Sequence, residues 1–223
     1  MIRVVPSAVS GKRLQKKKSM TIIDSIRWEC SEATVEQINK ANAPVLVIAG
    51  VSGSGKSYLA DHLIRRYANL AIVKTHTTRP PRESDNSTYF SCVSNRKFNE
   101  LLEQDAFFLA RYERHPCYGY LKDDVLDVIK NKKVPLFMFR HSGIKMITSL
   151  IVNVYIIAIE CAPSKSIEYS KSEIDTHSVN FASKSQFDIL ALTERCNNGC
   201  ILVNRYDNKF VNNEELHAFV RRL

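Results

Sequence analysis

The chain has 223 residues, 44% of them hydrophobic, and carries a formal net charge of +9. This length allows one sizeable core, so we expect a single domain and not a short scaffold stapled by disulfides. The longest apolar run, residues 151–159, is interrupted by Asn153 and is far too short to cross a bilayer, so no membrane span is expected.

The chain begins with a basic segment. Residues 1–20 hold six Lys or Arg side chains and no acid, so the rest of the chain carries only +3. No aromatic residues alternate with these charges as they do in single-strand binders, so we expect no nucleic-acid partner. We expect a cytoplasmic monomer or homodimer, although this start also fits an organelle transit peptide. We interpret residues 1–43 as a basic extension and a lead-in helix.

An alternating α/β pattern follows from residue 44 onward. Residues 45–49, VLVIA, are wholly apolar, which is typical of a parallel strand buried on both faces. Asn213 can cap a C-terminal helix. The pattern also predicts two further helices and three further strands, over residues 57–67 and 121–129 and over residues 134–139, 152–159 and 201–203. We predict an α/β fold with a parallel sheet flanked by helices.

Two segments interrupt this pattern within the predicted domain, residues 44–223. Residues 75–120 are predicted to form a small α+β insertion with its own core, including a helix that Ser94 caps. Residues from about 163 to 185 are rich in Ser and Lys and lack periodicity, so we expect a lid there. The core would then comprise residues 44–74 and 121–223.

A glycine-rich loop connects the first strand of this domain to its helix. Residues 50–57, GVSGSGKS, fit G-x-x-x-x-G-K-[ST] at every fixed position. In such a P-loop, backbone N–H groups surround the phosphates, the lysine reaches the β- and γ-phosphates, and the hydroxyl binds Mg²⁺. We therefore predict ATP and Mg²⁺ as cofactors. The predicted nucleotide-binding residues are Gly50, Ser52, Gly53, Ser54, Gly55, Lys56 and Ser57, with Ser57 also the metal ligand.

A second anion site is predicted in residues 75–82, THTTRPPR. The two prolines restrict the backbone between Arg79 and Arg82, and each guanidinium can fork onto phosphate oxygens. An ordinary solvated loop is the alternative for this segment taken alone. Downstream of a P-loop, however, it favours a clamp for a phosphorylated acceptor.

The motifs GVSGSGKS, THTTRPPR, Tyr89-Phe90, FNELLEQDAFF and HPCYGY follow one another as in the guanylate kinase family, which the chain resembles well over residues 45–160. The resemblance implies a P-loop α/β core with an acceptor-binding insertion and a lid. It also implies transfer of the γ-phosphoryl group of ATP to a nucleoside monophosphate, with Mg²⁺. The implied acceptor-binding residues are Thr75, Arg79, Arg82, Tyr89 and Tyr118.

The guanine-binding positions of the family differ in this sequence. The family's glutamate aligns with Leu109, its small hydroxyl residue aligns with Tyr120, and its acidic pair falls within residues 138–140, Met-Phe-Arg. Loss of a charged hydrogen-bond partner typically costs about 1.5–3 kcal/mol. The family's lid arginines are likewise replaced by lysines, namely Lys165, Lys171 and Lys184, with Arg195 further on. An acceptor phosphate is therefore expected, whereas the sequence does not specify guanine.

We predict a kinase for GMP or a related nucleoside monophosphate, with Lys56, Arg79, Arg82 and Arg140 as catalytic residues that neutralise phosphoryl charge. One alternative is a kinase similar to those that phosphorylate ribose 1,5-bisphosphate, in which Arg140 meets a second acceptor phosphate. The other is a catalytically weak binding module, like the scaffold domains that resemble this family. The intact P-loop favours an enzyme.

Overall fold

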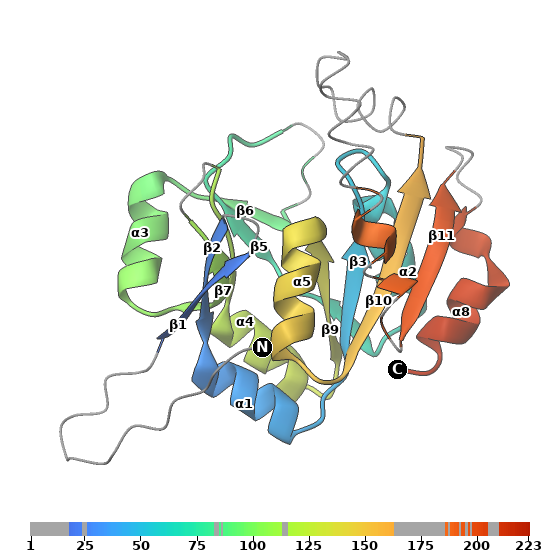
Figure 1. Ribbon diagram of the computed structural model, residues 1–223, viewed down its shortest axis with the longest axis horizontal. Helices are drawn as coiled ribbons and strands as arrows, with labels where there is room; N and C mark the ends of the chain where they lie inside the picture. The colour runs from blue at the N-terminus through green and yellow to red at the C-terminus, as the bar shows by residue number, and fades with distance from the viewer. Residues whose placement is uncertain are drawn as a thin grey trace.

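The structure is a computed structural model in which two sheets lie side by side (Figure 1). It describes residues 18–23, 26–82, 85, 87–112, 116–162, 186, 188–191, 193–194, 196, 198–204 and 210–223. The lid predicted at about 163–185 lies outside these residues, as do Lys165, Lys171, Lys184 and Arg195.

The larger sheet is entirely parallel, with the strand order β11-β10-β3-β9-β4. Its strands are β3 (Val45–Ala49), β4 (Leu70–Ile72), β9 (Val134–Phe139), β10 (Val154–Cys161) and β11 (Gly199–Asn204). The predictions for 45–49 and 134–139 are confirmed to the residue, and those for 152–159 and 201–203 with shifted ends. Short β4 was not predicted.

Helices cover both faces of this sheet, which explains why β3 is apolar throughout. Leu46 and Ile48 pack into the cluster that includes α2 (Lys56–Arg66) and α8 (Glu214–Val220). The alternate residues Val45, Val47 and Ala49 pack into a second cluster. That cluster includes side chains of α1 (Glu32–Lys40), α4 (Lys122–Lys130) and α5 (His141–Leu150). Successive residues of β3 therefore pack against helices on opposite faces of the sheet.

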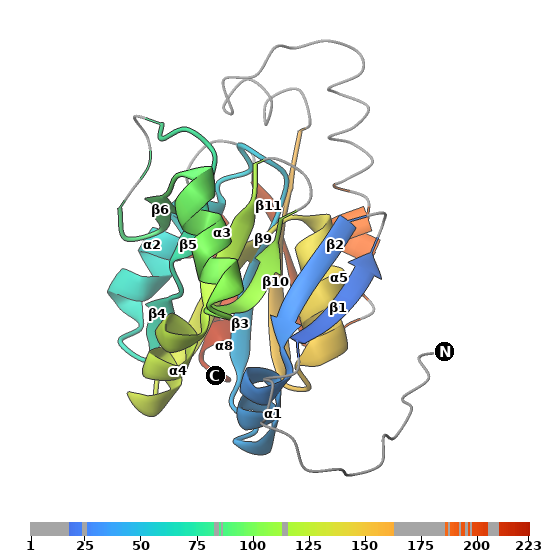
Figure 2. The ribbon, with the colours of Figure 1, turned by 90° about the vertical axis from the view of Figure 1, so that its left-hand side faces the viewer.

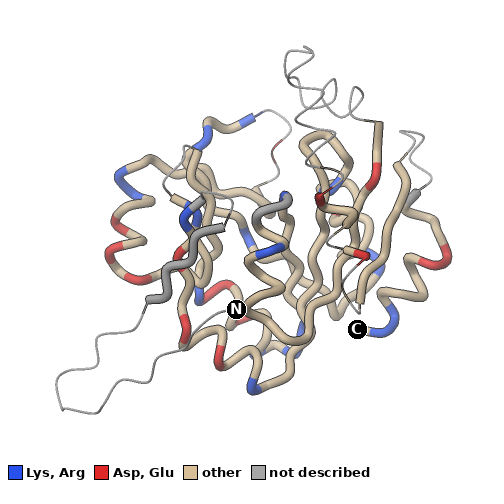
Figure 3. The backbone as a smooth tube through the Cα atoms, in the orientation of Figure 1, with Lys and Arg blue, Asp and Glu red and all other residues tan. Residues whose placement is uncertain are grey.

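The helix ends follow the capping residues in the sequence. Asn213 accepts the backbone N–H of Leu216 through Oδ1 at 3.1 Å, and Ser94 accepts that of Lys97 through Oγ at 3.1 Å. These bonds start α8 and α3 (Asn95–Glu103), as predicted. Along α3, at the left of Figure 3, the basic residues precede the acidic ones. None of the described helices is long and apolar enough to cross a membrane.

The smaller sheet has the strand order β1-β2-β7-β8-β5-β6. Four of its strands belong to the predicted insertion, namely β5 (Thr75–Thr77), β6 (Phe90–Cys92), β7 (Phe107–Arg111) and β8 (Tyr118–Leu121). Helix α3 packs on this sheet through Phe98, which stacks on Phe107 with ring centroids 4.7 Å apart. These two rings belong to a small buried cluster with Ala110 and Cys117, whereas Phe108, Leu109 and Tyr120 pack into the main cluster.

An N-terminal hairpin of β1 (Lys18–Ile23) and β2 (Ile26–Ser31) extends the smaller sheet. The sequence analysis predicted the helix that follows, now α1, but not this hairpin. Strand β2 alternates apolar Ile26, Trp28 and Cys30 with charged Arg27 and Glu29, a period-two signal that could have revealed it. Figure 2 shows the hairpin beside α5, which β1 contacts.

Candidate functional site

The P-loop connects β3 to α2 and adopts the backbone that its glycines allow. Gly53 and Gly55 have positive φ angles of 75° and 94°, which strain other residues. A Cβ on Gly50 would collide with the Ser54 side chain. Asn204, at the end of β11, donates from Nδ2 to the Ser54 carbonyl oxygen at 2.9 Å. The glycines and this cross-link hold the loop in a curled form above the parallel strands.

Lys56 folds back under the P-loop. Its Nζ donates to the carbonyl oxygens of Gly50 at 2.9 Å and Val51 at 2.7 Å. Burial, followed by the positive charge of Arg140, lowers the pKa of Lys56 to about 7. The ammonium group is therefore destabilised until an anion arrives, and a bound phosphate would favour its charged form.

The hydroxyl group of Ser57 lines the same cavity as Lys56. Its Oγ makes a weak contact with the sulfur of Met138, at 3.9 Å. The described residues contain no group of three or more His, Cys, Asp or Glu side chains that could hold a metal ion. The site therefore fits Mg²⁺ held by one hydroxyl and by the phosphates and waters of a ligand, its usual manner of binding at nucleotides.

Arg79 is paired with a carboxylate inside the predicted acceptor clamp. Its Nη1 and Nη2 donate to Asp85 Oδ2 and Oδ1 at 2.7 and 2.6 Å, and the Arg82 backbone N–H donates to Asp85 at 2.8 Å. Arg79 also lies over the Phe90 ring, 4.7 Å from its centroid. The hydrogen bonds from Arg79 lower the pKa of Asp85. The Asp85 carboxylate thus occupies the guanidinium N–H groups that are predicted to bind the acceptor phosphate.

Tyr89, which is predicted to bind the acceptor, does not line the cavity. Its hydroxyl group donates to Asp61 Oδ1 on α2 at 2.7 Å, and its ring is buried outside the cavity. The next residue, Phe90, lines the cavity instead. Neighbouring residues of an extended chain face opposite sides, so only one of the two can reach the cavity. A position expected to supply a hydroxyl therefore supplies an aromatic face.

Cross-strand pairing assembles the acceptor wall of the cavity. Thr75 on β5 pairs with Tyr120 on β8 and with Phe90 on β6, so the three side chains share one face of the sheet. Tyr118 pairs with Arg111 on β7, whose guanidinium lies 4.9 Å from the centre of its ring. The predicted residues Thr75 and Tyr118 thus belong to one wall.

Tyr120 closes this wall without offering its hydroxyl group to a ligand. The hydroxyl donates to the carbonyl oxygen of Met138 at 2.8 Å, and the ring packs edge-on against Phe137 and Phe139. Burial raises the pKa of Tyr120 to about 12. Tyr120 is therefore a neutral structural contact between the two sheets.

A cavity of about 370 Å³ lies between the P-loop and the smaller sheet. Most of the predicted site residues line it: Ser52, Gly53, Gly55, Lys56, Ser57, Thr75, Arg79, Arg82, Tyr118 and Arg140. Gly50, Ser54 and Tyr89 do not. The sequence analysis did not assign the other nine lining residues to the site, and Trp28, Asp85, Phe90 and Arg111 are among them.

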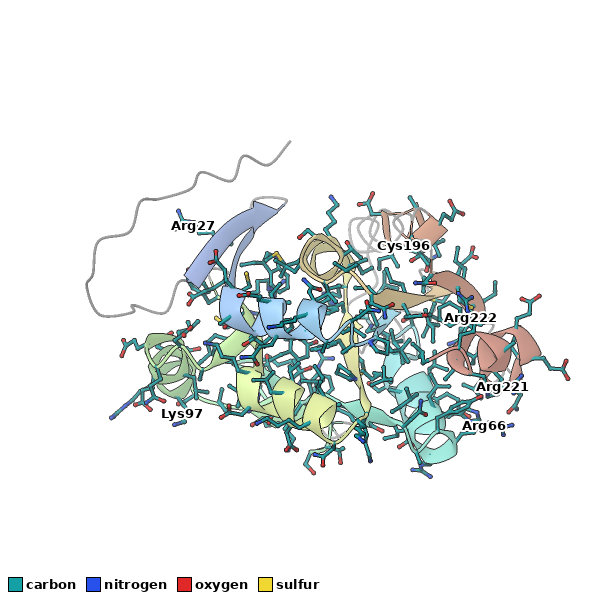
Figure 4. The ribbon with its side chains drawn as sticks, turned by 90° about the horizontal axis from the view of Figure 1, so that it is seen from below. Arg27, Arg66, Lys97, Cys196, Arg221 and Arg222 are labelled. Carbon is teal, nitrogen blue, oxygen red and sulfur yellow. The ribbon has the colours of Figure 1, made fainter. Side chains whose placement is uncertain are left out.

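Several basic residues lie at the two ends of the molecule. Figure 4 shows Arg27 and Lys97 at the end of the molecule that holds the hairpin and α3, and Arg66, Arg221 and Arg222 at the opposite end. The lining cations are Lys56, Arg79, Arg82, Arg111 and Arg140, and Asp85 is the one carboxylate among the described lining residues. The cavity is therefore strongly positive, as a site for several phosphate groups requires.

Known proteins resemble this chain in sequence and in fold. The family model described as guanylate kinase matches residues 42–218. The guanylate kinase of Neisseria gonorrhoeae is 38% identical over 64 residues, which cover 28% of this chain and 31% of that protein. The guanylate kinase of Coxiella burnetii is 34% identical over 117 residues, 51% of this chain and 54% of that protein. These matches span less than two thirds of the length of either relative.

A solved structure also shares the fold. The crystal structure of guanylate kinase from Anaplasma phagocytophilum superposes with a TM-score of 0.58 at 16% sequence identity. The superposition covers 81% of this chain and 85% of that one. The P-loop α/β architecture is therefore the same, whereas the hairpin β1–β2 precedes the first residue of the family match.

Proposed function

The chain belongs to the guanylate kinase family, and from this premise we propose that it transfers the γ-phosphoryl group of ATP to a nucleoside monophosphate, GMP or a relative. One observation carries this proposal. The P-loop residues Gly55, Lys56 and Ser57 and the clamp residues Arg79 and Arg82 line a single cavity. Two anion sites that face one space can bring a donor and an acceptor phosphate together.

On the donor side, the P-loop backbone N–H groups and Lys56 would bind the β- and γ-phosphates. Ser57 would hold Mg²⁺, which when bound neutralises phosphate charge. Lys56 must leave the carbonyl oxygens of Gly50 and Val51 to reach the γ-phosphate. Arg140, which lines the cavity at the start of α5, would add positive charge near the moving phosphoryl group.

On the acceptor side, the phosphate would bind Arg79, Arg82 and Tyr118, with Thr75 beside the rest of the molecule. Asp85 now accepts both hydrogen bonds of the Arg79 fork. The acceptor phosphate must therefore displace Asp85 or share the guanidinium with it. Catalysis in this scheme is positioning and charge neutralisation, and no protein group forms a covalent bond to the phosphoryl group.

The test measures ADP release with Mg·ATP and a panel of nucleoside monophosphates. We expect at least one of them to raise ADP release above the rate without acceptor. The Lys56→Ala variant should abolish this increase, because it removes the cation at the phosphates. If the folded protein releases no additional ADP with any of them, the proposed kinase activity is wrong.

A catalytically weak binding module is the second candidate, and the Arg79–Asp85 pair is the observation that favours it. Asp85 neutralises the charge of Arg79. A clamp neutralised in this way can bind a partner without turning over a substrate. ATP affinity distinguishes the two. A kinase should bind ATP and lose this affinity in Lys56→Ala, whereas a module without a working P-loop should bind little ATP in either form.

A further inference from the structure

Three side chains form a row at the edge of the cavity that the N-terminal hairpin contributes. In the register of the smaller sheet, Trp28 on β2 stands opposite Arg111 on β7, which stands opposite Tyr118 on β8. Directly paired residues face the same side of a sheet, and all three line the cavity. Trp28 precedes the segment that matches the family, residues 42–218. The hairpin therefore contributes to this wall a side chain that lies outside the matched segment.

Trp28 brings a buried hydrogen-bond donor to this wall. Its side chain is only 4% exposed, and its Nε1–H is buried without a hydrogen-bond partner among the described residues. An indole N–H can donate but never accept. Buried donors in native proteins are normally paired, so an unpaired one beside a cavity points to a ligand atom that accepts from it.

Arg111 supplies positive charge beside this donor. Its Nη2 donates to the Pro116 carbonyl oxygen at 3.0 Å while its guanidinium lies over the Tyr118 ring. These two contacts fix the plane of the guanidinium, whose remaining N–H groups can only donate. An arginine held in this way is suited to planar recognition of oxygen atoms, above all those of phosphate.

The same wall lacks hydrogen-bond acceptors of the kind that guanine needs. The next row of the sheet pairs Cys30 on β2 with Leu109 on β7, both buried. Among the described lining residues, the one carboxylate is Asp85, and Arg79 occupies both of its oxygens. The N–H groups on the Watson–Crick edge of guanine would therefore face other donors.

We propose that Trp28 and Arg111 form a subsite for oxygen hydrogen-bond acceptors on the phosphate acceptor, at its end remote from the clamp. This inference rests on the proposed function and gives the class of its substrate. Two sources supply such oxygens, a second phosphate on a sugar or the carbonyl groups of uracil. Strands lie about 4.8 Å apart, so Arg111 on β7 is about 10 Å from β5, which leads into the clamp. That distance leaves room for a sugar or a small base.

Binding of matched acceptors tests the subsite without ATP. Calorimetric titrations would compare GMP with UMP, and ribose 5-phosphate with ribose 1,5-bisphosphate, on the wild type and on Trp28→Phe. The variant keeps the ring and removes the N–H group. We expect UMP or the bisphosphate to bind more tightly than GMP and to lose about tenfold in affinity in the variant, which corresponds to about 1.4 kcal/mol. If UMP responds, the oxygens belong to a uracil base; if the bisphosphate responds, they belong to a second phosphate.

Two results would overturn the subsite. GMP could bind at least as tightly as the other three, or Trp28→Phe could leave every affinity unchanged. A purely structural role for Trp28 would instead lower the melting temperature of the ligand-free variant by the same amount as that of the liganded one. Tyr67→Phe is the control, because it removes a hydroxyl 2.9 Å from His217 Nδ1, remote from the cavity, and should not change acceptor affinity.

ADP release separates this inference from the proposed function. If UMP or the bisphosphate binds through Trp28 and no ADP forms with any acceptor, the kinase proposal fails and the subsite stands. If ADP forms with GMP as the best acceptor and Trp28→Phe has no effect, the kinase stands and the subsite fails.

Discussion

The donor side and the acceptor side of the cavity are built in different ways. The donor side is one contiguous loop, residues 50–57, whose binding groups are mainly backbone N–H groups and one lysine. The acceptor side is a wall of side chains from the strands β2, β7, β8, β5 and β6 and from the segment around Asp85. Residues as distant in sequence as Trp28 and Arg111 are neighbours there.

This difference determines which residue substitutions each side of the cavity tolerates. A loop that binds through its backbone tolerates few changes, because its glycines are required by their φ angles and by close approach. A wall of side chains can exchange one residue at a time while the sheet persists. In this chain the donor side keeps every fixed position of its motif, whereas the acceptor side has Leu109 and Tyr120 at positions where the family resemblance implies guanine-binding residues. Under the proposed function, the acceptor side would therefore set substrate preference.

The largest expected effect is a loss of stability on the acceptor side of the cavity. Phe98 is fully buried in the small cluster with Phe107, Ala110 and Cys117. Phe98→Ala should lower the free energy of unfolding by about 3–5 kcal/mol, measured by urea denaturation. The larger clusters lie outside this one, so ATP affinity should persist while acceptor affinity falls. An equal loss of both affinities would show that the two sides are not separable.

The next effect removes the charge of the donor side. Lys56→Ala should reduce kcat by about 100-fold to 1,000-fold, because no other P-loop side chain carries a positive charge to the phosphates. Acceptor affinity, measured without nucleotide, should stay unchanged. Lys97→Ala on α3 is the matched control, since Lys97 lies at the far end of the molecule (Figure 4). A kcat that falls in the control as well would point to unfolding.

A smaller effect concerns the carboxylate in the acceptor clamp. Asp85→Asn removes the negative charge that Arg79 now binds, so the acceptor KM should fall by about tenfold, or about 1.4 kcal/mol. The same variant should lose about 1.5–3 kcal/mol of stability, the usual value of a charged hydrogen bond. Glu100→Gln, which breaks an exposed pair with Arg96 on α3, should change neither quantity. An increased KM in Asp85→Asn would mean that Asp85 orients the clamp for binding and does not compete.

The smallest effect is a pH dependence confined to the donor side. The pKa of Lys56 is about 7 in the folded chain, below its ordinary value of 10.5. Between these values the unfolded state binds one more proton, so the stability of the nucleotide-free protein should rise with pH. ATP affinity should fall over the same window, by at most about tenfold per pH unit, because ATP favours the charged lysine. Lys56→Met should remove both slopes, whereas a slope that persists would belong to another group.

The sequence alone determined the P-loop and most strands of the central sheet. The P-loop, strand β3 and the caps Ser94 and Asn213 all depend on contacts within a few residues, so composition and spacing are sufficient to predict them. The order of motifs also identified the guanylate kinase family, which the match over residues 42–218 confirms.

Only the tertiary structure decided the acceptor side. The pairing of Trp28 with Arg111 joins strands about eighty residues apart, and no local pattern specifies such a register. The choice of Phe90 over Tyr89 at the cavity depends on which face of the chain the sheet buries. The ion pair of Asp85 with Arg79 joins side chains six residues apart that no local pattern brings together. Side chains that meet across strands acquire their roles from packing, and packing exists only once the sheet has formed.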